Sequence, residues 1–141
     1  MTVRHIFHLS IPVAELAPAK RFYVETLGAT PGRESEDWLD VIVWGHQITL
    51  QRRPAETRAL HEQGKRHFGV VLPWHEWEHE VKRLKELGTS FLGEPEVLLA
   101  GTAQEQAKFY LNDPSHNVIE VKTYRDPVGT LMLDGQTSVL A

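Results

Sequence analysis

Two histidines and one glutamate, far apart in the sequence, occur in the same local pattern. His8, His67 and Glu120 lie in the segments HIFHLSI, RHFGVVL and NVIEVKTY, where the residues at odd offsets are large and apolar. Alternate side chains of a strand point to opposite faces, so each of the three is expected to face away from the core. Two imidazoles and a carboxylate can form a facial ligand set that leaves open positions on a divalent metal, as in non-haem Fe(II) oxygenases. The three residues therefore predict a metal site.

The elements that would position these residues occur in the same order in two halves of the chain. His8 precedes Gly28 by 20 residues, and His67 precedes Gly88 by 21, with an apolar stripe at helical spacing before each glycine. Each half therefore reads as a βαβββ module. The expected boundaries are a first module over 5–52, a linker over 53–66, a second module over 67–124 and an irregular tail over 125–141, all in a single domain.

The expected strands and helices follow from alternation, helical spacing and the position of glycine. In the first half they are a strand over 5–11, a helix over 15–27, and strands near 30–35, 37–44 and 46–51. In the second half they are a strand over 67–72, a helix over 75–87, and strands near 90–98, 107–112 and 117–124.

The duplication predicts which residues occupy equivalent positions. His67 corresponds to His8, and Glu120 corresponds to Thr49, because Ile48-Thr49-Leu50 matches Ile119-Glu120-Val121. A pseudo-twofold pairing of the modules would bring His8, Thr49, His67 and Glu120 to one cavity. Threonine is a poor ligand for a divalent ion, so three ligands and exchangeable positions for water, substrate or O₂ are expected.

Composition excludes several classes of function. The chain has 141 residues, of which 41% are hydrophobic, enough for one folded domain with a core. The net charge of −4 and the absence of a basic run argue against binding to nucleic acid or to an anionic membrane. The chain contains no cysteine, which excludes disulfides and thiolate metal sites. The opening segment lacks a signal-peptide pattern, and a cytoplasmic location is expected.

Taken together, the motifs resemble the vicinal oxygen chelate superfamily, which includes glyoxalase I, bleomycin-resistance proteins and extradiol dioxygenases. The resemblance covers about residues 5–124 and rests, in order, on HLSIPV from His8, Phe22-Tyr23, Leu27-Gly28, HFGV from His67, Phe109-Tyr110, Asp113-Pro114 and Ile119-Glu120. It implies an α+β fold in which two tandem βαβββ modules form a cupped eight-stranded mixed sheet with helices outside and a metal inside the cup. It also implies a homodimer.

The resemblance also implies a ligand set and a reaction. The superfamily's metal ligands carry over as His8, His67 and Glu120. Glyoxalase I-like members have Glu or Gln as a fourth ligand where this chain has Thr49, so the three-ligand extradiol dioxygenases are the better match. The implied activity is cleavage of a small catechol-like aromatic with O₂ at Fe(II), with Mn(II), Zn(II) or Ni(II) as alternative metals. Tyr110, ten residues before Glu120, and His46 are then the expected catalytic residues.

Other interpretations remain open. A glyoxalase-like isomerase or lyase would use the same ligands, and a non-catalytic drug-binding protein of the same fold would need none. Tyr110 could be an ordinary amphipathic core residue. His46 shares strand parity with Ile48 and Leu50, which should face the helices, so it reaches the cup only if the strand begins after it or bulges. His116 replaces the glycine usual after Asp-Pro-Ser, and the turn is expected to tolerate it.

A protease-like motif also needs an interpretation. His75-Glu76-Trp77-Glu78-His79 fits the HExxH pattern of zinc proteases. Its histidines, however, fall on a charged helical stripe opposite the apolar one, which predicts a solvated surface. We therefore expect no metal at this motif.

Overall fold

The computed structural model of the protein describes residues 5–135, which form two compact units. The first unit comprises the chain up to His67 together with Asn112–Val118, and the second comprises Phe68–Leu111 and the chain from Ile119 onward. No helix within residues 5–135 is long and apolar enough to cross a lipid bilayer.

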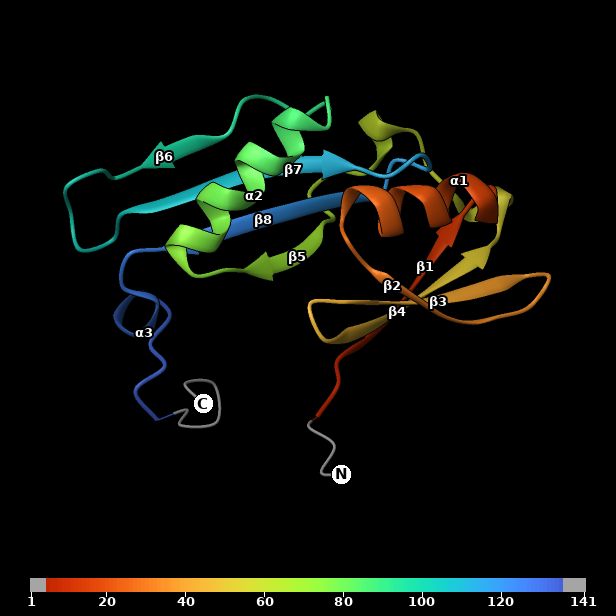
Figure 1. Ribbon diagram of the computed structural model, residues 1–141, viewed down its shortest axis with the longest axis horizontal. Coiled ribbons are helices and arrows are strands. Elements are labelled where there is room, and N and C mark those ends of the chain that lie inside the picture. The colour runs from red at the N-terminus through yellow and green to blue at the C-terminus, as the bar shows by residue number, and fades with distance from the viewer. Residues whose placement is uncertain (1–4, 136–141) are drawn as a thin grey trace. The chain divides into compact units, whose positions relative to one another are not determined.

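The first unit is a βαβββ module (Figure 1). Its sheet has the order β1-β4-β3-β2, with β1 parallel to β4 and the remaining neighbours antiparallel. Helix α1 continues into a π-helical turn, η1, and packs against β3 and β4. The elements are β1 (His8–Val13), α1 (Leu16–Arg21), η1 (Phe22–Thr26), β2 (Thr30–Glu34), β3 (Trp38–Val43), β4 (His46–Arg52) and the 3-10 turns η2 (Pro54–Glu56) and η3 (Leu60–Glu62).

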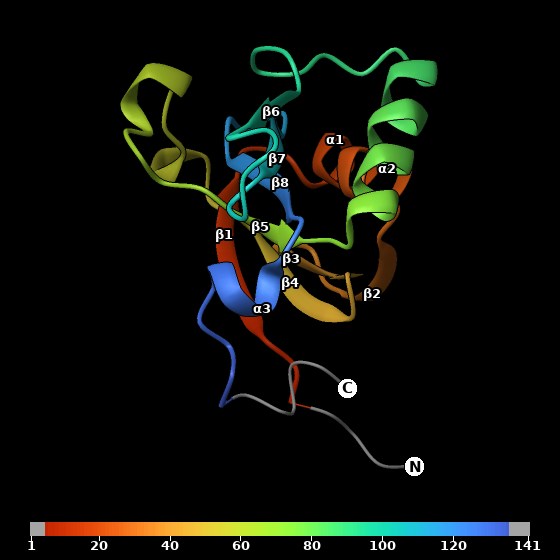
Figure 2. The same ribbon diagram turned by 90° about the vertical axis from the view of Figure 1, so that its left-hand side faces the viewer.

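The second unit repeats this arrangement, with the sheet order β5-β8-β7-β6. Helix α2 lies along one face of the sheet (Figure 2). The indole N–H of Trp77 donates to the carbonyl of Val121 at 3.0 Å. Phe109 and Ile119 are buried, and the ring centre of Phe109 lies 5.9 Å from that of Trp77. The elements are β5 (Phe68–Val71), α2 (Trp74–Glu86), β6 (Glu96–Leu98), β7 (Gln106–Asn112), β8 (Val118–Tyr124) and α3 (Pro127–Thr130).

The predicted α+β class and the two tandem βαβββ modules are confirmed, and the eight strands within residues 5–135 form two four-stranded mixed sheets. Gly28 and Gly88 end the two helices with φ values of +75° and +74°, a conformation that glycine adopts without a steric cost. The strand expected near 90–98 is reduced to Glu96–Leu98, because Gly93 has positive φ and Pro95 cannot donate to a ladder.

The ends of the chain also differ from expectation. The first strand begins at His8 rather than at residue 5. The segment after β8 was expected to be irregular, but Pro127–Thr130 form one helical turn in which the Asp126 side chain accepts a hydrogen bond from the N–H of Gly129. Residues 136–141 of the expected tail lie outside the described residues.

The turn between β7 and β8 is a buried hydrogen-bonded centre of the first unit. Both carboxylate oxygens of Asp113 accept two bonds each: Oδ1 from the N–H groups of Ser115 and Asn117, and Oδ2 from Tyr23 Oη at 2.8 Å and Asn117 Nδ2 at 2.9 Å. Burial, together with the Asp113 charge, raises the pKa of Tyr23, so the phenol stays protonated and donates. His116 adopts φ +66°, which confirms that the turn accommodates this residue.

Candidate functional site

The strand registers of the two sheets match residue for residue around the predicted ligands. In the first sheet Ser10, two residues after His8, lies opposite Thr49. In the second sheet Gly69, two residues after His67, lies opposite Glu120. The equivalence of Thr49 and Glu120 that the sequence predicts is therefore reproduced by the pairing inside each unit. This equivalence does not depend on how the units are arranged.

The polar face of the first sheet holds a buried carboxylate that the sequence argument did not single out. Asp40 on β3 pairs with Thr49 on β4 and is only 3% exposed. Its Oδ1 accepts from Thr49 Oγ1 at 2.7 Å, and its Oδ2 accepts from Arg33 Nε at 2.9 Å and Gln47 Nε2 at 3.2 Å. The alternation in DWLDVIVW could have identified it, because Asp40 has the parity opposite to the buried Leu39 and Val41.

The hydrogen bonds around Asp40 decide its charge. Burial alone would raise the pKa of this carboxyl, but the bonds from Thr49, Arg33 and Gln47 outweigh burial and hold the pKa below its ordinary value of 3.8. Asp40 is therefore ionised at neutral pH. Thr49, at the position equivalent to Glu120, donates its hydroxyl hydrogen to this carboxylate.

Replacing Asp40 with asparagine is expected to destabilise the protein at neutral pH but not in acid. A carboxyl whose pKa is depressed by folding stabilises the native state above its unfolded pKa and loses that contribution as pH falls through the folded pKa. The urea midpoints of wild type and Asp40→Asn should therefore differ at about pH 7 and converge below about pH 4. The exposed substitution Asp134→Asn is the control. An equal difference between wild type and Asp40→Asn at both pH values would contradict this account.

The second sheet places Glu120 where its backbone closely approaches a glycine. Glu120 on β8 is 6% exposed, and Gly69 lies directly opposite on the parallel strand β5. A Cβ built at Gly69 would overlap the carbonyl oxygen of Glu120. Any side chain at position 69 would therefore displace the backbone of Glu120, which explains the glycine in HFGV.

We expect Gly69→Ala to perturb Glu120 specifically. The overlap should cost about 1–3 kcal/mol of the free energy of unfolding, the usual penalty of overpacking. It should also lower divalent-metal affinity by roughly 10–100-fold, as displacement of a ligand's support does. Gly135→Ala, where an added Cβ meets nothing within 4 Å, is the matched control. Calorimetric metal titration of both variants checks this, and unchanged affinity in a folded Gly69→Ala protein would disprove it.

The two predicted histidine ligands are both exposed. His67 Nδ1 lies 2.8 Å from the carbonyl oxygen of Lys65, so in the neutral ring Nδ1 carries the hydrogen and Nε2 carries the lone pair. A hydrogen bond of this type orients the histidines that bind metals in proteins. His8 is the first residue of β1 and lies opposite Gln47. Both histidines belong to the first unit and Glu120 to the second.

The predicted triad stays a prediction at this point. Within either unit, over residues 5–135, no three His, Asp or Glu side chains gather where one metal ion could bind them. The structure shows two local features of these residues. The ring of His67 is oriented by its contact with the Lys65 carbonyl, and the backbone of Glu120 lies close to Gly69 on the neighbouring strand.

The two expected catalytic residues have different surroundings. Tyr110 on β7 is half-buried, and its neighbours Phe109 and Leu111 are buried on the opposite face, as the parity argument requires. His46 begins β4, opposite Val43, and its Nδ1 accepts a hydrogen bond from the Phe7 N–H at 2.9 Å. The strand thus includes His46, and this imidazole supports the chain just before β1.

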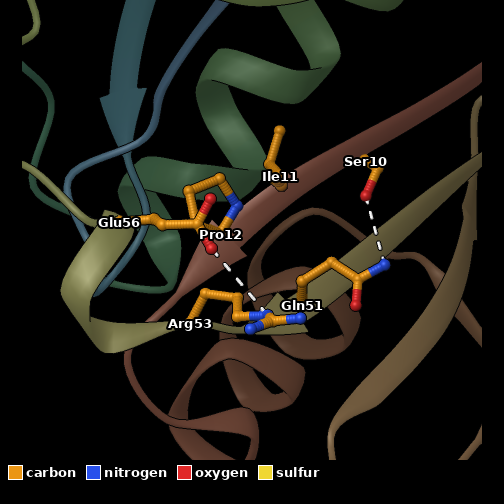
Figure 3. Close-up of a pocket in the computed structure, with 6 residues that line it drawn as sticks. All are labelled: Ser10, Ile11, Pro12, Gln51, Arg53 and Glu56. Carbon is orange, nitrogen blue, oxygen red and sulfur yellow. Dashed lines mark hydrogen bonds and ion pairs between the residues drawn. The ribbon is translucent and has the colours of Figure 1, made fainter.

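The HExxH motif is on the surface of α2, as expected. His75 and His79 are exposed, whereas Trp77 and Leu84 on the other stripe are buried. A shallow open pocket of about 330 Å³ lies in the first unit, lined by Ser10, Ile11, Pro12, Gln51, Arg53 and Glu56. Figure 3 shows that polar pairs occupy its wall, with Gln51 bonded to Ser10 and Arg53 paired with Glu56.

Lysines and tyrosines accompany Glu120 on the polar face of the second sheet. Lys122 Nζ lies 3.7 Å from Glu120 Oε1 and 5.2 Å from the ring centre of Tyr124. A hydrogen bond with Tyr124, aided by the charge of Glu120 and opposed by burial, raises the pKa of Lys122. Lys108 Nζ lies 5.5 Å from the ring centre of Tyr110. Neither lysine was predicted from the sequence, although both share the parity of Tyr110 and Glu120.

Comparison with known proteins assigns the family. The model of the Glyoxalase/Bleomycin resistance protein/Dioxygenase superfamily matches residues 5–121. The chain belongs to this superfamily. The resemblance inferred from the motifs is thereby confirmed for the superfamily as a whole. No curated protein matches the sequence.

Several solved structures share the fold. A glyoxalase/bleomycin resistance protein/dioxygenase from Alicyclobacillus acidocaldarius is 29% identical, with a TM-score of 0.78 over 86% of this chain and 92% of that chain. The fosfomycin resistance protein FosX from Listeria monocytogenes is 15% identical, with a TM-score of 0.66 over 86% and 94% of the two chains. An integron cassette protein from V. cholerae is 23% identical, with a TM-score of 0.58 over 88% and 98%.

Proposed function

We propose that this member of the glyoxalase superfamily is a divalent-metal enzyme that cleaves a small catechol-like aromatic with O₂ at Fe(II). His8, His67 and Glu120 are the proposed ligands. The observation that carries the proposal is the matched strand register. The residue two positions after His8 pairs with Thr49 in one sheet, and the residue two positions after His67 pairs with Glu120 in the other. His8 and His67 thus have equivalent places in a duplicated fold, and Glu120 has the place equivalent to Thr49.

The donor set suits the proposed metal. Two neutral imidazoles and one carboxylate, with a threonine at the fourth position, favour Fe(II) with open positions over a closed structural site. The bond from His67 Nδ1 to the Lys65 carbonyl favours the neutral tautomer with the hydrogen on Nδ1 and the lone pair on Nε2. When bound, the metal would acidify a chelating diol and hold it beside O₂.

The chain's own residues would handle the protons. Tyr110 has the parity of Glu120, and its phenol is the proposed donor to the substrate oxygen. His46 does not meet the condition set for a catalytic role, because β4 begins at His46 in regular register with β3. Its Nδ1 accepts the Phe7 N–H, and we propose no proton transfer at this residue. We further propose that the protein is a cytoplasmic homodimer. It would bind a small-molecule substrate and neither nucleic acid nor a membrane.

Oxygen consumption tests the proposed reaction. Protein prepared anaerobically and loaded with Fe(II) should consume O₂ with at least one member of a panel of catechols and form a ring-opened product. Tyr110→Phe should lower kcat by about 10²-fold, the usual contribution of a positioned acid, while leaving Fe(II) affinity unchanged. Turnover with Ni(II), Co(II) or Zn(II) and none with Fe(II) and O₂ would instead identify an isomerase or lyase. Tight binding of a planar drug by metal-free protein would identify a sequestering protein.

A further inference from the structure

A cluster of two lysines and two tyrosines lies beside Glu120 on β7 and β8, which are neighbours in the second sheet. We call it the lysine–tyrosine face, and it consists of Lys108, Tyr110, Lys122 and Tyr124. All four residues belong to the second unit and occupy alternate positions of their strands. The electrostatic interaction of Lys122 with Tyr110 and Tyr124 links the two strands of this face.

The two ammonium groups are held in place and are only partly accessible. The side chains of Lys108 and Lys122 are 28% and 32% exposed, well below the usual exposure of a surface lysine. The tyrosine rings beside them at 5.5 and 5.2 Å make cation–π contacts that restrict each lysine stem. Side chains ordered in this way lose little conformational entropy when a ligand binds.

The charges of this face balance only while Glu120 is available to Lys122. Within the second unit, Lys122 pairs with Glu120 and Lys108 pairs with the exposed Glu96, both at 3.7 Å. In the proposed function the Glu120 carboxylate would bind a divalent cation instead. Both ammonium groups would then lie near a divalent cation, and within this unit Glu96 would be the carboxylate still paired with them. This excess of positive charge favours the binding of an additional anion.

We propose that the substrate carries a small anionic group, a carboxylate or a phosphate, and that Lys108 and Lys122 bind it. This inference rests on the proposed function for its role in catalysis, but the anion subsite itself belongs to the second sheet alone. It narrows the substrate class from neutral catechols to anionic ones. The ammonium groups act as specificity-determining residues, and the substrate's reacting oxygens would lie toward Glu120.

Binding of simple anions to the metal-free full-length chain tests the subsite without any turnover. Inorganic phosphate and benzoate, titrated at low ionic strength, should shift amide resonances of β7 and β8 in ¹⁵N spectra. Lys108→Met should weaken binding by about 10-fold or more, as loss of a charged hydrogen-bond partner does. Lys85→Met, on the exposed surface of α2, is the matched control and should change nothing.

A second variant separates an anion subsite from a structural ion pair. Glu120→Gln removes the carboxylate that competes for Lys122, so anion affinity should rise by several-fold although metal binding is lost. Lys122→Met should weaken anion binding as Lys108→Met does. If Lys122→Met fails to fold, Lys122→Arg, which keeps the positive charge, should retain anion binding. Resonance shifts that fall outside β7 and β8, or affinities indifferent to Lys108→Met and Glu120→Gln, would overturn the proposal.

Substrate selectivity tests the catalytic role and identifies the anion. For Fe(II)-loaded enzyme, Lys108→Met should raise KM for 3,4-dihydroxybenzoate by about 10-fold and leave KM for catechol unchanged. A stronger response to phosphate than to benzoate in the titrations would assign the phosphate instead of the carboxylate. If no diol is turned over, the dioxygenase proposal fails while the anion titrations still decide the subsite. Equal effects of Lys108→Met on neutral and anionic diols would contradict the proposal.

Discussion

Replacing Glu120 with glutamine is expected to lower Fe(II) affinity by at least about 100-fold and to abolish oxygen consumption. Loss of a residue that merely supports a ligand costs 10–100-fold, and loss of the only anionic ligand should exceed that. The amide keeps the volume of a side chain that is 6% exposed, so the fold should persist. Anaerobic calorimetric titration with Fe(II) measures the affinity.

The matched control for this substitution is Glu94→Gln, an exposed carboxylate in the same unit. It should leave both metal affinity and turnover within error of wild type. A Glu120→Gln protein that is folded and binds Fe(II) as tightly as wild type would remove Glu120 from the ligand set.

Replacing Asp113 with alanine should cost about 3–5 kcal/mol of the free energy of unfolding, although this residue lies outside the proposed reaction. The carboxylate is 1% exposed and accepts four hydrogen bonds, among them one from the fully buried Tyr23 hydroxyl. Its removal leaves buried donors without an acceptor, a loss typical of broken buried networks. Urea denaturation followed by circular dichroism measures it.

Graded variants of the same network provide the controls. Tyr23→Phe deletes one of the four donors to Asp113 and should cost about 1–2 kcal/mol. Asp134→Ala, on an exposed carboxylate, should stay within about 0.5 kcal/mol of wild type. A loss below about 1 kcal/mol for Asp113→Ala would show that the turn does not anchor the β7–β8 connection to the first unit.

The sequence predicted the repeated modules because alternation and glycine positions are local signals. Gly28 and Gly88 end the helices as expected, and the odd-offset neighbours of Glu120 are buried. The same parity applied to β3, β7 and β8 would have found Asp40, Lys108 and Lys122. They were not predicted, because parity alone does not separate these residues from other polar residues of a strand.

Other features depend on contacts that local patterns do not encode. The bonds between Tyr23 and Asp113 join residues 90 positions apart. The bond between His46 and the Phe7 backbone likewise spans 39 positions and was not predicted. The family match confirms the superfamily. The ligands, the metal and the substrate are proposals that the experiments on Glu120, Tyr110 and Lys108 test.

Anomalous diffraction from crystals grown anaerobically with Fe(II) tests the central claim most directly. Data collected on either side of the iron K edge locate the metal without reference to activity. We predict one site per chain, coordinated by Nε2 of His67, an imidazole nitrogen of His8 and the carboxylate of Glu120. Iron bound at His75 and His79 of α2, or no ordered iron at all, would contradict the account.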